Sequence, residues 1–493
     1  MRDAVPLLVG AASDAYEHGD RIERVIAHHA ALRPDAVALE QGDERLSYAQ
    51  LVAAADAVAA RLAKEGIGPG DVVPVCLGRS TDLVVALLGV LTAGAAYIAM
   101  DPAWPSARRA DVLRDCGARL QIGTDRSGSD LSLLDPSDMP AGPDRPALPM
   151  DLDGRAPACV FYTSGSTGRP KGVLSPHRGT IRTLVGCPTV PLDRETVFLQ
   201  AAPLAWDAAS MELWGPLLNG GRCVLLDRRS DVLDADALRK ALRRGLNTLW
   251  LTSSLFNLFA EEAPDLLGRL RLLLVGGERV SPRHVRTILD RFPAVQVVNG
   301  YGPAECTIFA TTHVIRPADV SSPGADVPIG RPIPYTGVAL VDAEGRRVGR
   351  DEPGEVALSG DGLATGYLAA PDETARRFFD LDGVRHYRTG DVASLDAEGN
   401  LRYRGRADRQ FKINGVRIEP GEVEAVLESH PRVAACCVVR LEPTAGQPQV
   451  GFLYVSTDGA PIDAGELRAV AAPHLLNAMI PTVLHQVDRP QRS

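Results

Sequence analysis

The sequence lacks C-x-x-C cysteine motifs and has very few lysines. Its eight cysteines show no C-x-x-C spacing, so we expect free thiols in a reducing compartment and no structural zinc site. The net charge of −9 disfavours nucleic acid or an anionic membrane surface as a partner. Residues 1–20 carry too short an apolar run for a signal peptide, so the sequence predicts a cytoplasmic protein.

Long uninterrupted apolar segments are also missing. Residues 83–100 carry no charge, but Gly89, Thr92 and Gly94 interrupt them. The pattern therefore predicts a buried helix, a turn and a short core strand rather than a helix that spans a bilayer.

Short apolar runs alternate with amphipathic segments up to about residue 330, which predicts parallel sheets with crossover helices. Strands are expected at 71–77, 157–162, 222–226, 247–252, 271–277 and 295–302, and helices at 235–245 and 286–292. After residue 327, Gly- and Asp-rich strand–turn–strand patterns predict an antiparallel, barrel-like part. Residues from 419 onward predict a small α+β unit, and residues 125–157 an exposed loop.

The stretch YTSGSTGRPKGV, residues 162–173, combines hydroxyls, glycines and one lysine. Glycines let backbone N–H groups turn toward an anion, hydroxyls add donors, and Lys171 supplies a point charge. The stretch therefore predicts a phosphate-binding loop, with a flexible surface turn as the alternative. It is not the common P-loop, because Pro170 precedes the lysine. We expect Lys171 to lie in an extended, mobile loop.

This stretch resembles the signature loop of the adenylate-forming superfamily, and three further segments match other motifs of that superfamily. The superfamily includes acyl-CoA synthetases, luciferases and nonribosomal peptide synthetase adenylation domains. The segments LTAGAAYIAMDPAWP (91–105), NGYGPAECT (299–307) and YRTGDVASLDAEGNLRYRGRADRQFKINGVRIEPGEVE (387–424) match in the family's order. The resemblance covers residues 20 to 485 and is closest to an amino-acid adenylation domain. It implies ATP and Mg²⁺ as cofactors and an α/β fold: two packed α/β subdomains, a β-barrel-like subdomain and a small α+β C-terminal lid.

The resemblance also implies roles for individual residues. Catalytic roles fall on Lys171, Glu305 and Lys412, and Glu305 is the expected Mg²⁺ ligand. Tyr301 offers a face for adenine and Asp391 suits the ribose hydroxyls. As alternatives, Asp391 could cap a turn and Arg406 could pair with Glu398. The full set of ATP-binding candidates is Thr163, Ser164, Gly165, Ser166, Thr167, Gly168, Gly277, Glu278, Asn299, Gly300, Tyr301, Asp391 and Arg406.

The segment APLAWDAASMELWGPLLNGG (202–221) resembles the amino-acid pocket of such domains. Asp207 matches the aspartate that pairs with a substrate α-ammonium; a helix N-cap is the alternative reading, and both can hold. The expected pocket residues are Asp207, Ala208, Met211, Leu251, Leu274, Gly276, Gly300, Ile308 and Phe309. Because the lining is aliphatic and two glycines leave room, we expect valine, isoleucine or leucine, with valine preferred.

The resemblance divides the chain into an adenylation core, residues 1–407, and a mobile C-terminal lid, residues 408–493, with Asp408 as the hinge. The lid would bring residues 412–415 to the site, where Gly415 lets the backbone approach a pantetheine arm. The expected partner is a peptidyl or acyl carrier protein, and the need for a small MbtH-like activator stays open. An acyl- or aryl-CoA synthetase and a nucleotide-binding scaffold with little turnover are the alternatives.

Two positions depart from the family pattern. Ala304 stands where a threonine is usual before Glu305. The family's C-terminal N-G-K lysine has no counterpart, since no lysine follows Lys412; Arg489 and Arg492 are candidate substitutes. We therefore expect either a truncated lid or slow adenylation.

Overall fold

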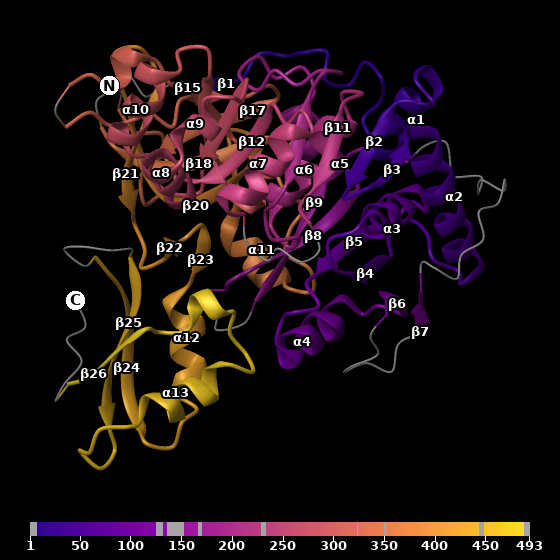
Figure 1. Cartoon of the computed structure of the whole chain (residues 1–493). Helices are drawn as coiled ribbons and strands as arrows, with labels where there is room; N and C mark the ends of the chain where they lie inside the picture. Colours follow the sequence, from indigo (N-terminus) through magenta and orange to yellow (C-terminus); the bar gives the residue numbers. More distant parts are fainter. Residues whose placement is uncertain are drawn as a thin grey trace.

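The structure, a computed structural model, has a large body and a smaller C-terminal unit below it, which we call the lid (Figure 1). It describes residues 7–124, 132–135, 152–165, 170–227, 233–322, 324–349, 352–442 and 448–487. The predicted loop at 125–157 and the candidates Ser166, Thr167, Gly168, Arg489 and Arg492 lie wholly or largely outside these residues.

One sheet of the body carries the hydroxyl-rich stretch. Its order is β7–β6–β4–β5–β8–β9, parallel except for the final β8–β9 pair. The bounds are β4 (Val72–Cys76), β5 (Ala96–Met100), β6 (Leu120–Gly123), β7 (Ser132–Leu134), β8 (Pro157–Thr163) and β9 (Lys171–Pro176). The apolar stretch at 83–100 forms α3 (Thr81–Thr92), a turn at Gly94 with φ +83°, and β5, as the sequence predicts.

A second sheet forms the other half of the body and has the order β16–β15–β14–β13–β12–β10–β11–β2–β3. Its central strands are parallel, and crossover helices connect them. The bounds are β2 (Val37–Gln41), β3 (Glu44–Ser47), β10 (Val197–Gln200), β11 (Arg222–Leu225), β12 (Thr248–Thr252), β13 (Leu272–Gly276), β14 (Gln296–Tyr301), β15 (Thr311–Val314) and β16 (Arg331–Pro332).

Helices cover these sheets, and several begin at a capping side chain. Ser47 and Gln50 form a capping box at the start of α2, and Asp234 caps α7. The remaining bounds are α1 (Ile22–Leu32), α2 (Tyr48–Lys64), α4 (Ser106–Cys116), α5 (His177–Leu184), α6 (Asp207–Leu217), α7 (Ala235–Arg243), α8 (Ser253–Glu262), α9 (Pro264–Leu267), α10 (Pro282–Arg291) and α11 (Pro371–Arg377).

The third sheet of the body is antiparallel and runs β1–β17–β18–β20–β19, with β21 paired to β20. The bounds are β1 (Leu8–Val9), β17 (Thr336–Val341), β18 (Gly354–Gly360), β19 (Phe378–Leu381), β20 (Val384–Leu395) and β21 (Leu401–Arg406). This sheet is the antiparallel part predicted after residue 327. It places Asp391 on β20 opposite Arg406 on β21.

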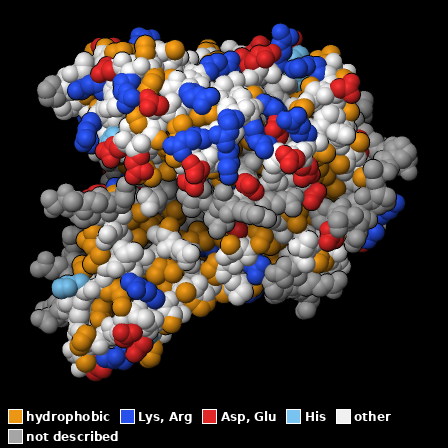
Figure 2. Space-filling model, viewed as in Figure 1, with side chains coloured by type: hydrophobic (Ala, Val, Ile, Leu, Met, Phe, Trp, Pro, Cys, Tyr) orange, Lys and Arg blue, Asp and Glu red, His pale blue; other side chains and the backbone are white. Residues whose placement is uncertain are grey.

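The lid has its own hydrophobic core, which includes Ile418, Val423, Phe452, Leu467 and Met479. It comprises the hairpin β22 (Phe411–Ile413) and β23 (Val416–Ile418), α12 (Pro420–Leu427), β24 (Val433–Leu441), β25 (Gln449–Ser456), α13 (Ala464–Ala471) and β26 (Val483–Gln486). On the face shown in Figure 2, most charged side chains lie over the body, and the lid shows a larger share of hydrophobic ones. A separate core accords with the predicted division near Asp408, which stays a prediction.

The α/β fold class is confirmed, and one local prediction is wrong. Lys171 is not in an extended loop but is the first residue of β9, paired with Thr163 of β8. The two ends of the hydroxyl-rich stretch therefore lie in paired antiparallel strands. Within the part of the chain that the structure describes, no helix is long and apolar enough to cross a bilayer.

Candidate active site between body and lid

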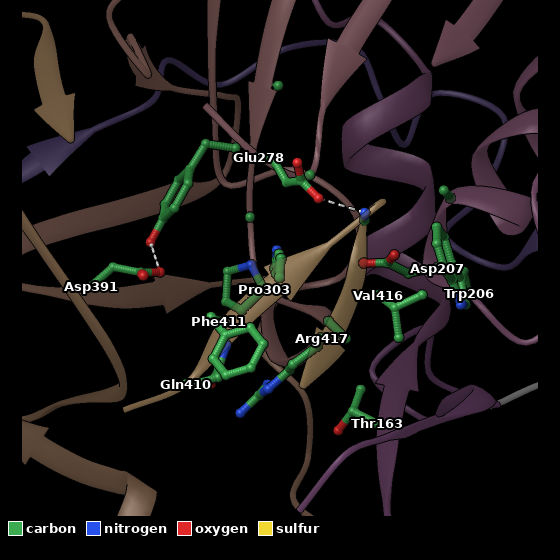
Figure 3. Close-up of a pocket in the computed structure, with 18 of the residues that line it drawn as sticks. Thr163, Trp206, Asp207, Glu278, Pro303, Asp391, Gln410, Phe411, Val416 and Arg417 are labelled. Carbon is green, nitrogen blue, oxygen red and sulfur yellow. Dashed lines mark hydrogen bonds between the residues drawn. The ribbon is translucent and has the colours of Figure 1, made fainter. Parts of the chain in front are cut away.

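A cavity of about 670 Å³ lies where the lid hairpin β22–β23 meets the body. In Figure 3, Asp391 lies on one side of this cavity and Asp207 with Trp206 on the other. The lid residues Phe411, Val416 and Arg417 lie between them. Segments that are far apart in the sequence therefore line this cavity together.

The Asp391 side combines three of the predicted nucleotide-binding residues. The Tyr301 hydroxyl donates to Asp391 Oδ2 at 2.7 Å (Figure 3), and Arg406 Nη1 donates to Oδ1 at 2.6 Å. Burial and the neighbouring carboxylate raise the pKa of Tyr301, so its hydroxyl stays a donor. Arg406 also pairs with Asp408 and not with Glu398, the partner considered from the sequence.

Asn299 lies on the same strand as Tyr301 and lines the cavity. Its amide donates to the backbone oxygen of Pro328 at 2.8 Å, which fixes the side chain against the wall. The amide oxygen of such a fixed side chain is a suitable partner for a base edge.

Asp207 is the first residue of α6, and Trp206 occupies the N-cap position. Its Oδ2 accepts the backbone N–H of Ile308 at 3.2 Å. That N–H comes from a strained turn, in which Thr307 and Ile308 have φ of +51° and +67°. Burial raises the pKa of Asp207 to about 6, although the positive charge of Lys412 opposes this rise. Asp207 is thus a partly buried carboxylate that lines the cavity.

The lining beside Asp207 is apolar, as the sequence predicts. The predicted residues Ala208, Met211, Gly300, Ile308 and Phe309 all line the cavity. Phe161, Trp206 and Trp250 line it as well, although the sequence analysis did not select them. Their aromatic rings leave less room than an all-aliphatic lining.

Three predicted pocket residues do not line the cavity. Leu251 faces the opposite side of β12 and packs in the second hydrophobic cluster, whereas its neighbour Trp250 faces the site. Side chains alternate along a strand, so a one-residue shift in the prediction selects the wrong face. Leu274 lies on the site face, paired with Trp250 in the strand register, but is fully buried and forms no part of the lining.

Gly276 and Gly300 are needed for close packing around the strands, and they do not leave space for a substrate side chain. A Cβ on Gly276, the third residue outside the lining, would lie 2.4 Å from the backbone oxygen of Gly300. A Cβ on Gly300 would lie 2.3 Å from the Phe309 ring. The prediction that these two glycines leave room for a side chain is therefore wrong: the space is already filled.

The lid hairpin enters the cavity at its tip. Gly415 donates its N–H to Glu278 Oε1 at 2.7 Å, the second dashed bond in Figure 3. It has φ +82°, and a Cβ there would lie 2.6 Å from Thr252 Cγ2 and 3.1 Å from the Trp206 ring. Only glycine fits without displacement of the hairpin.

Lys412 lies in the same hairpin and lines the cavity. Burial lowers its pKa, and the carboxylates of Asp391 and Asp207 oppose that shift. Lys412 is thus a partly buried ammonium group that interacts electrostatically with the carboxylates on both sides of the site.

The hydroxyl-rich stretch contributes its first residues to the site. Thr163 and Ser164 line the cavity, and Gly277 and Glu278 face them from the end of β13. Ser164 Oγ donates to the backbone oxygen of Arg417 at 2.7 Å, and the Gly165 N–H donates to Glu422 Oε2 at 3.1 Å. The start of this loop is thus bound to the lid.

Lys171, in contrast, does not line the cavity. Its Nζ lies 2.6 Å from Glu373 Oε1 on α11 and 5.7 Å from the centroid of the Tyr367 ring. The side chain is largely buried in this ion pair. To reach a phosphate, Lys171 would have to leave Glu373.

Glu305, the expected Mg²⁺ ligand, is fully buried and already satisfied. Arg417 Nη1 donates to Oε1 at 3.0 Å and Oε2 at 3.2 Å, and the Tyr367 hydroxyl donates to Oε1 at 2.7 Å. Burial alone would raise the pKa of Glu305, but Arg417 and Tyr367 bring it down to about 2. With the lid in this position, Arg417 and Tyr367 occupy three of the acceptor positions of Glu305, so a divalent cation would compete with Arg417 for this carboxylate. Sequence reasoning did not anticipate the role of Arg417.

Comparisons with known proteins show which family the chain resembles. The model of the family described as AMP-binding enzyme matches residues 26–368. Malpibaldin synthetase of Mortierella alpina is 37% identical over 486 residues, which cover 95% of this chain and 9% of the synthetase. Gramicidin S synthase 2 of Brevibacillus brevis is 33% identical over 485 residues, which cover 96% and 11%. The chain thus spans a small fraction of the length of these relatives.

The chain is also similar to solved structures. The chain is similar to holo-PA1221, an NRPS protein containing adenylation and PCP domains bound to vinylsulfonamide inhibitor, with a TM-score of 0.87 and 34% identity. The match covers 97% of this chain and 82% of that one.

Proposed function

The chain belongs to the AMP-binding enzyme family, and on that premise we propose that it activates an amino acid as aminoacyl-AMP, with release of pyrophosphate from ATP. The proposal extends to transfer of the aminoacyl group to the phosphopantetheine thiol of a carrier protein. An apolar aliphatic amino acid, valine first, is the proposed substrate.

The partly buried carboxylate of Asp207 is the observation that carries this proposal. Among the described residues it forms no ion pair within 4.0 Å, and its one side-chain hydrogen bond comes from a backbone N–H. A partly buried carboxylate of this kind favours a cationic ligand, because an unpaired buried charge is costly. An α-ammonium group satisfies it, whereas a fatty or aryl acid brings no positive charge.

The remaining lining supports an apolar side chain of moderate size. Ala208, Met211, Ile308 and Phe309 present no charge, and Trp250 bounds the space. On the opposite side, the Tyr301 ring and the Asp391 carboxylate suit an adenosine. These features support the proposal that one cavity binds both the carboxylic acid and the nucleotide.

In this mechanism the chain mainly positions its reactants. Asp207 would hold the ammonium group and Asp391 the ribose. Thr163 and Ser164, which line the cavity at the end of β8, would donate to the phosphates. The carboxylate of the substrate attacks the α-phosphorus, and pyrophosphate leaves. Gly415 gives the thiol arm of a carrier a close approach in the later transfer.

Pyrophosphate exchange measured across the twenty amino acids and their β-isomers tests the proposal. We expect the highest exchange with valine, isoleucine or leucine, and little with glutamate or lysine. Highest turnover with a free fatty acid would contradict the proposal and favour an acyl-CoA synthetase. Binding of ATP without any exchange would favour a scaffold with little turnover.

A further inference from the structure

The Arg417–Glu305 pair joins the lid to the body at the point where the phosphates are expected. Glu305 is fully buried, and the Arg417 side chain is about one-sixth exposed. Arg417 also donates through Nη2 to Glu419 at 3.0 Å, so its guanidinium is held at both ends. In this lid position Arg417 is the cation that neutralises Glu305.

A guanidinium and a divalent cation would compete for this carboxylate. Arg417 contacts both oxygens, and the Tyr367 hydroxyl occupies a further site on Oε1. A magnesium ion requires near-octahedral oxygen ligands at about 2.0–2.1 Å. A second cation at that distance would be repelled by the guanidinium on the same carboxylate, so each of the two weakens the binding of the other.

The same short segment of the lid carries its other contacts with the body. The backbone oxygen of Arg417 accepts the Ser164 hydroxyl, and Glu422 accepts the Gly165 N–H and pairs with Arg108 at 3.2 Å. Displacement of Arg417 therefore disturbs the hydrogen bonds between the lid and Ser164 and Gly165. The charge state of Glu305 and the lid position are linked through one side chain.

We propose that Arg417 is a positioning residue that holds the lid in this docked arrangement by taking the place of a divalent cation on Glu305, so that lid docking and metal loading oppose each other. The inference rests on the proposed function, in which a nucleotide and a divalent cation bind here. Because linkage is reciprocal, the cation weakens docking by the same factor by which docking weakens the cation.

The test uses the full chain and a non-hydrolysable ATP analogue with a methylene group between the α and β phosphorus atoms. Calorimetry gives analogue affinity as a function of Mg²⁺ concentration. Hydrogen exchange of residues 411–427 reports the lid position. In the native chain, we expect this segment to be protected without ligand and to lose protection when the analogue binds with Mg²⁺, but not when it is added with EDTA.

In Arg417→Gln we expect the segment to exchange rapidly without ligand. We also expect the Mg²⁺ concentration that gives half of the maximal analogue affinity to be about tenfold lower, because Arg417 no longer competes with Mg²⁺ for Glu305. Arg417→Lys keeps the charge, so its exchange rate and its Mg²⁺ requirement should lie between those of the native chain and those of Arg417→Gln. Arg432→Gln is the matched control, since Arg432 pairs with Asp458 on the exposed surface of the lid, and it should change neither readout.

Glu305→Gln provides a second route if Arg417→Gln does not fold. It retains the shape of the side chain, removes the charge that attracts Arg417, and should release the segment whether or not Mg²⁺ is present. An unchanged Mg²⁺ requirement in Arg417→Gln, or a segment that stays protected with the analogue and Mg²⁺ bound, would overturn this inference alone. No analogue binding by the native chain would overturn the proposed function as well.

Discussion

At the scale of single residues, the site is built from buried charges, and most of them have an opposite charge close by. Asp391 pairs with Arg406 and Glu305 with Arg417, and outside the cavity lining Lys171 pairs with Glu373. Asp207 differs, because its charge is met only by a backbone N–H and a more distant Lys412. The carboxylate without a close cation is the one that a substrate ammonium would complete.

The raised pKa of Asp207 predicts how amino-acid affinity depends on pH. A carboxyl with a pKa of about 6 is ionised at pH 7.5 and becomes protonated as the pH falls through 6. Only the ionised form attracts an ammonium group, so affinity should fall up to about tenfold per pH unit below 6. Calorimetric titration of valine between pH 7.5 and 5.0 measures this fall.

Asp207→Asn is the control for this prediction. It should bind valine roughly 30- to 1000-fold more weakly at pH 7.5, the scale of about 2–4 kcal/mol for a lost buried ion pair, and should show a flat pH profile. ATP affinity should be unchanged. A native profile that stays flat down to pH 5 would contradict the assignment of Asp207.

At the scale of elements, strand alternation decides which side chains reach the substrate. On β12, Trp250 faces the cavity and Leu251 faces the hydrophobic cluster on the other side of the sheet. Trp250 Nε1 is buried without a hydrogen-bond partner among the described residues. The indole therefore acts mainly as an apolar wall.

Substitutions on β12 should separate specificity from stability. Trp250→Ala enlarges the cavity and should move the preference from valine toward larger side chains by roughly 10- to 100-fold. Leu251→Ala leaves a void in the far cluster and should lower the free energy of unfolding by about 2–5 kcal/mol, with the order of substrates unchanged. Pyrophosphate exchange and thermal unfolding measure the two effects. A changed substrate order in Leu251→Ala would contradict the strand orientation.

At the scale of the whole molecule, the lid is held against the body by buried polar contacts. Arg108 of α4 and Glu422 of α12 are each about 2% exposed and lie 3.2 Å apart. Glu422 also accepts the Gly165 N–H. Loss of one partner leaves the other buried and unpaired, which costs more than the pair contributes.

A double-mutant cycle on this pair should show strong coupling. Arg108→Ala and Glu422→Gln should each weaken lid docking by about 3–5 kcal/mol, and the double variant by less than their sum. Hydrogen exchange of α12 measures docking. Glu424→Gln is the control on the same helix: its partner Arg409 is more than half exposed, so the effect should stay below about 1 kcal/mol. Additive effects at Arg108 and Glu422 would show that the pair does not hold the lid.

Much of this architecture could be predicted from the sequence, because local patterns fix it. The apolar runs at β4, β11, β12, β13 and β14 fall within a residue or two of their predicted positions, and Gly94 breaks the long apolar stretch as expected. The family resemblance also indicated Tyr301, Asp391 and Asp207 as site candidates, and all three line one cavity.

Only the tertiary structure decided the partners of these residues and the face on which each lies. Nothing local distinguishes Trp250 from Leu251, since one residue of strand register exchanges their environments. Glu305 meets Arg417 from 112 positions away, and Lys171 meets Glu373 from 202 positions away. The sequence by itself determined which segments become strands and which side chains carry charge. Which charges neutralise one another depends on the docking of separate units, because electrostatic attraction acts through space and not along the chain.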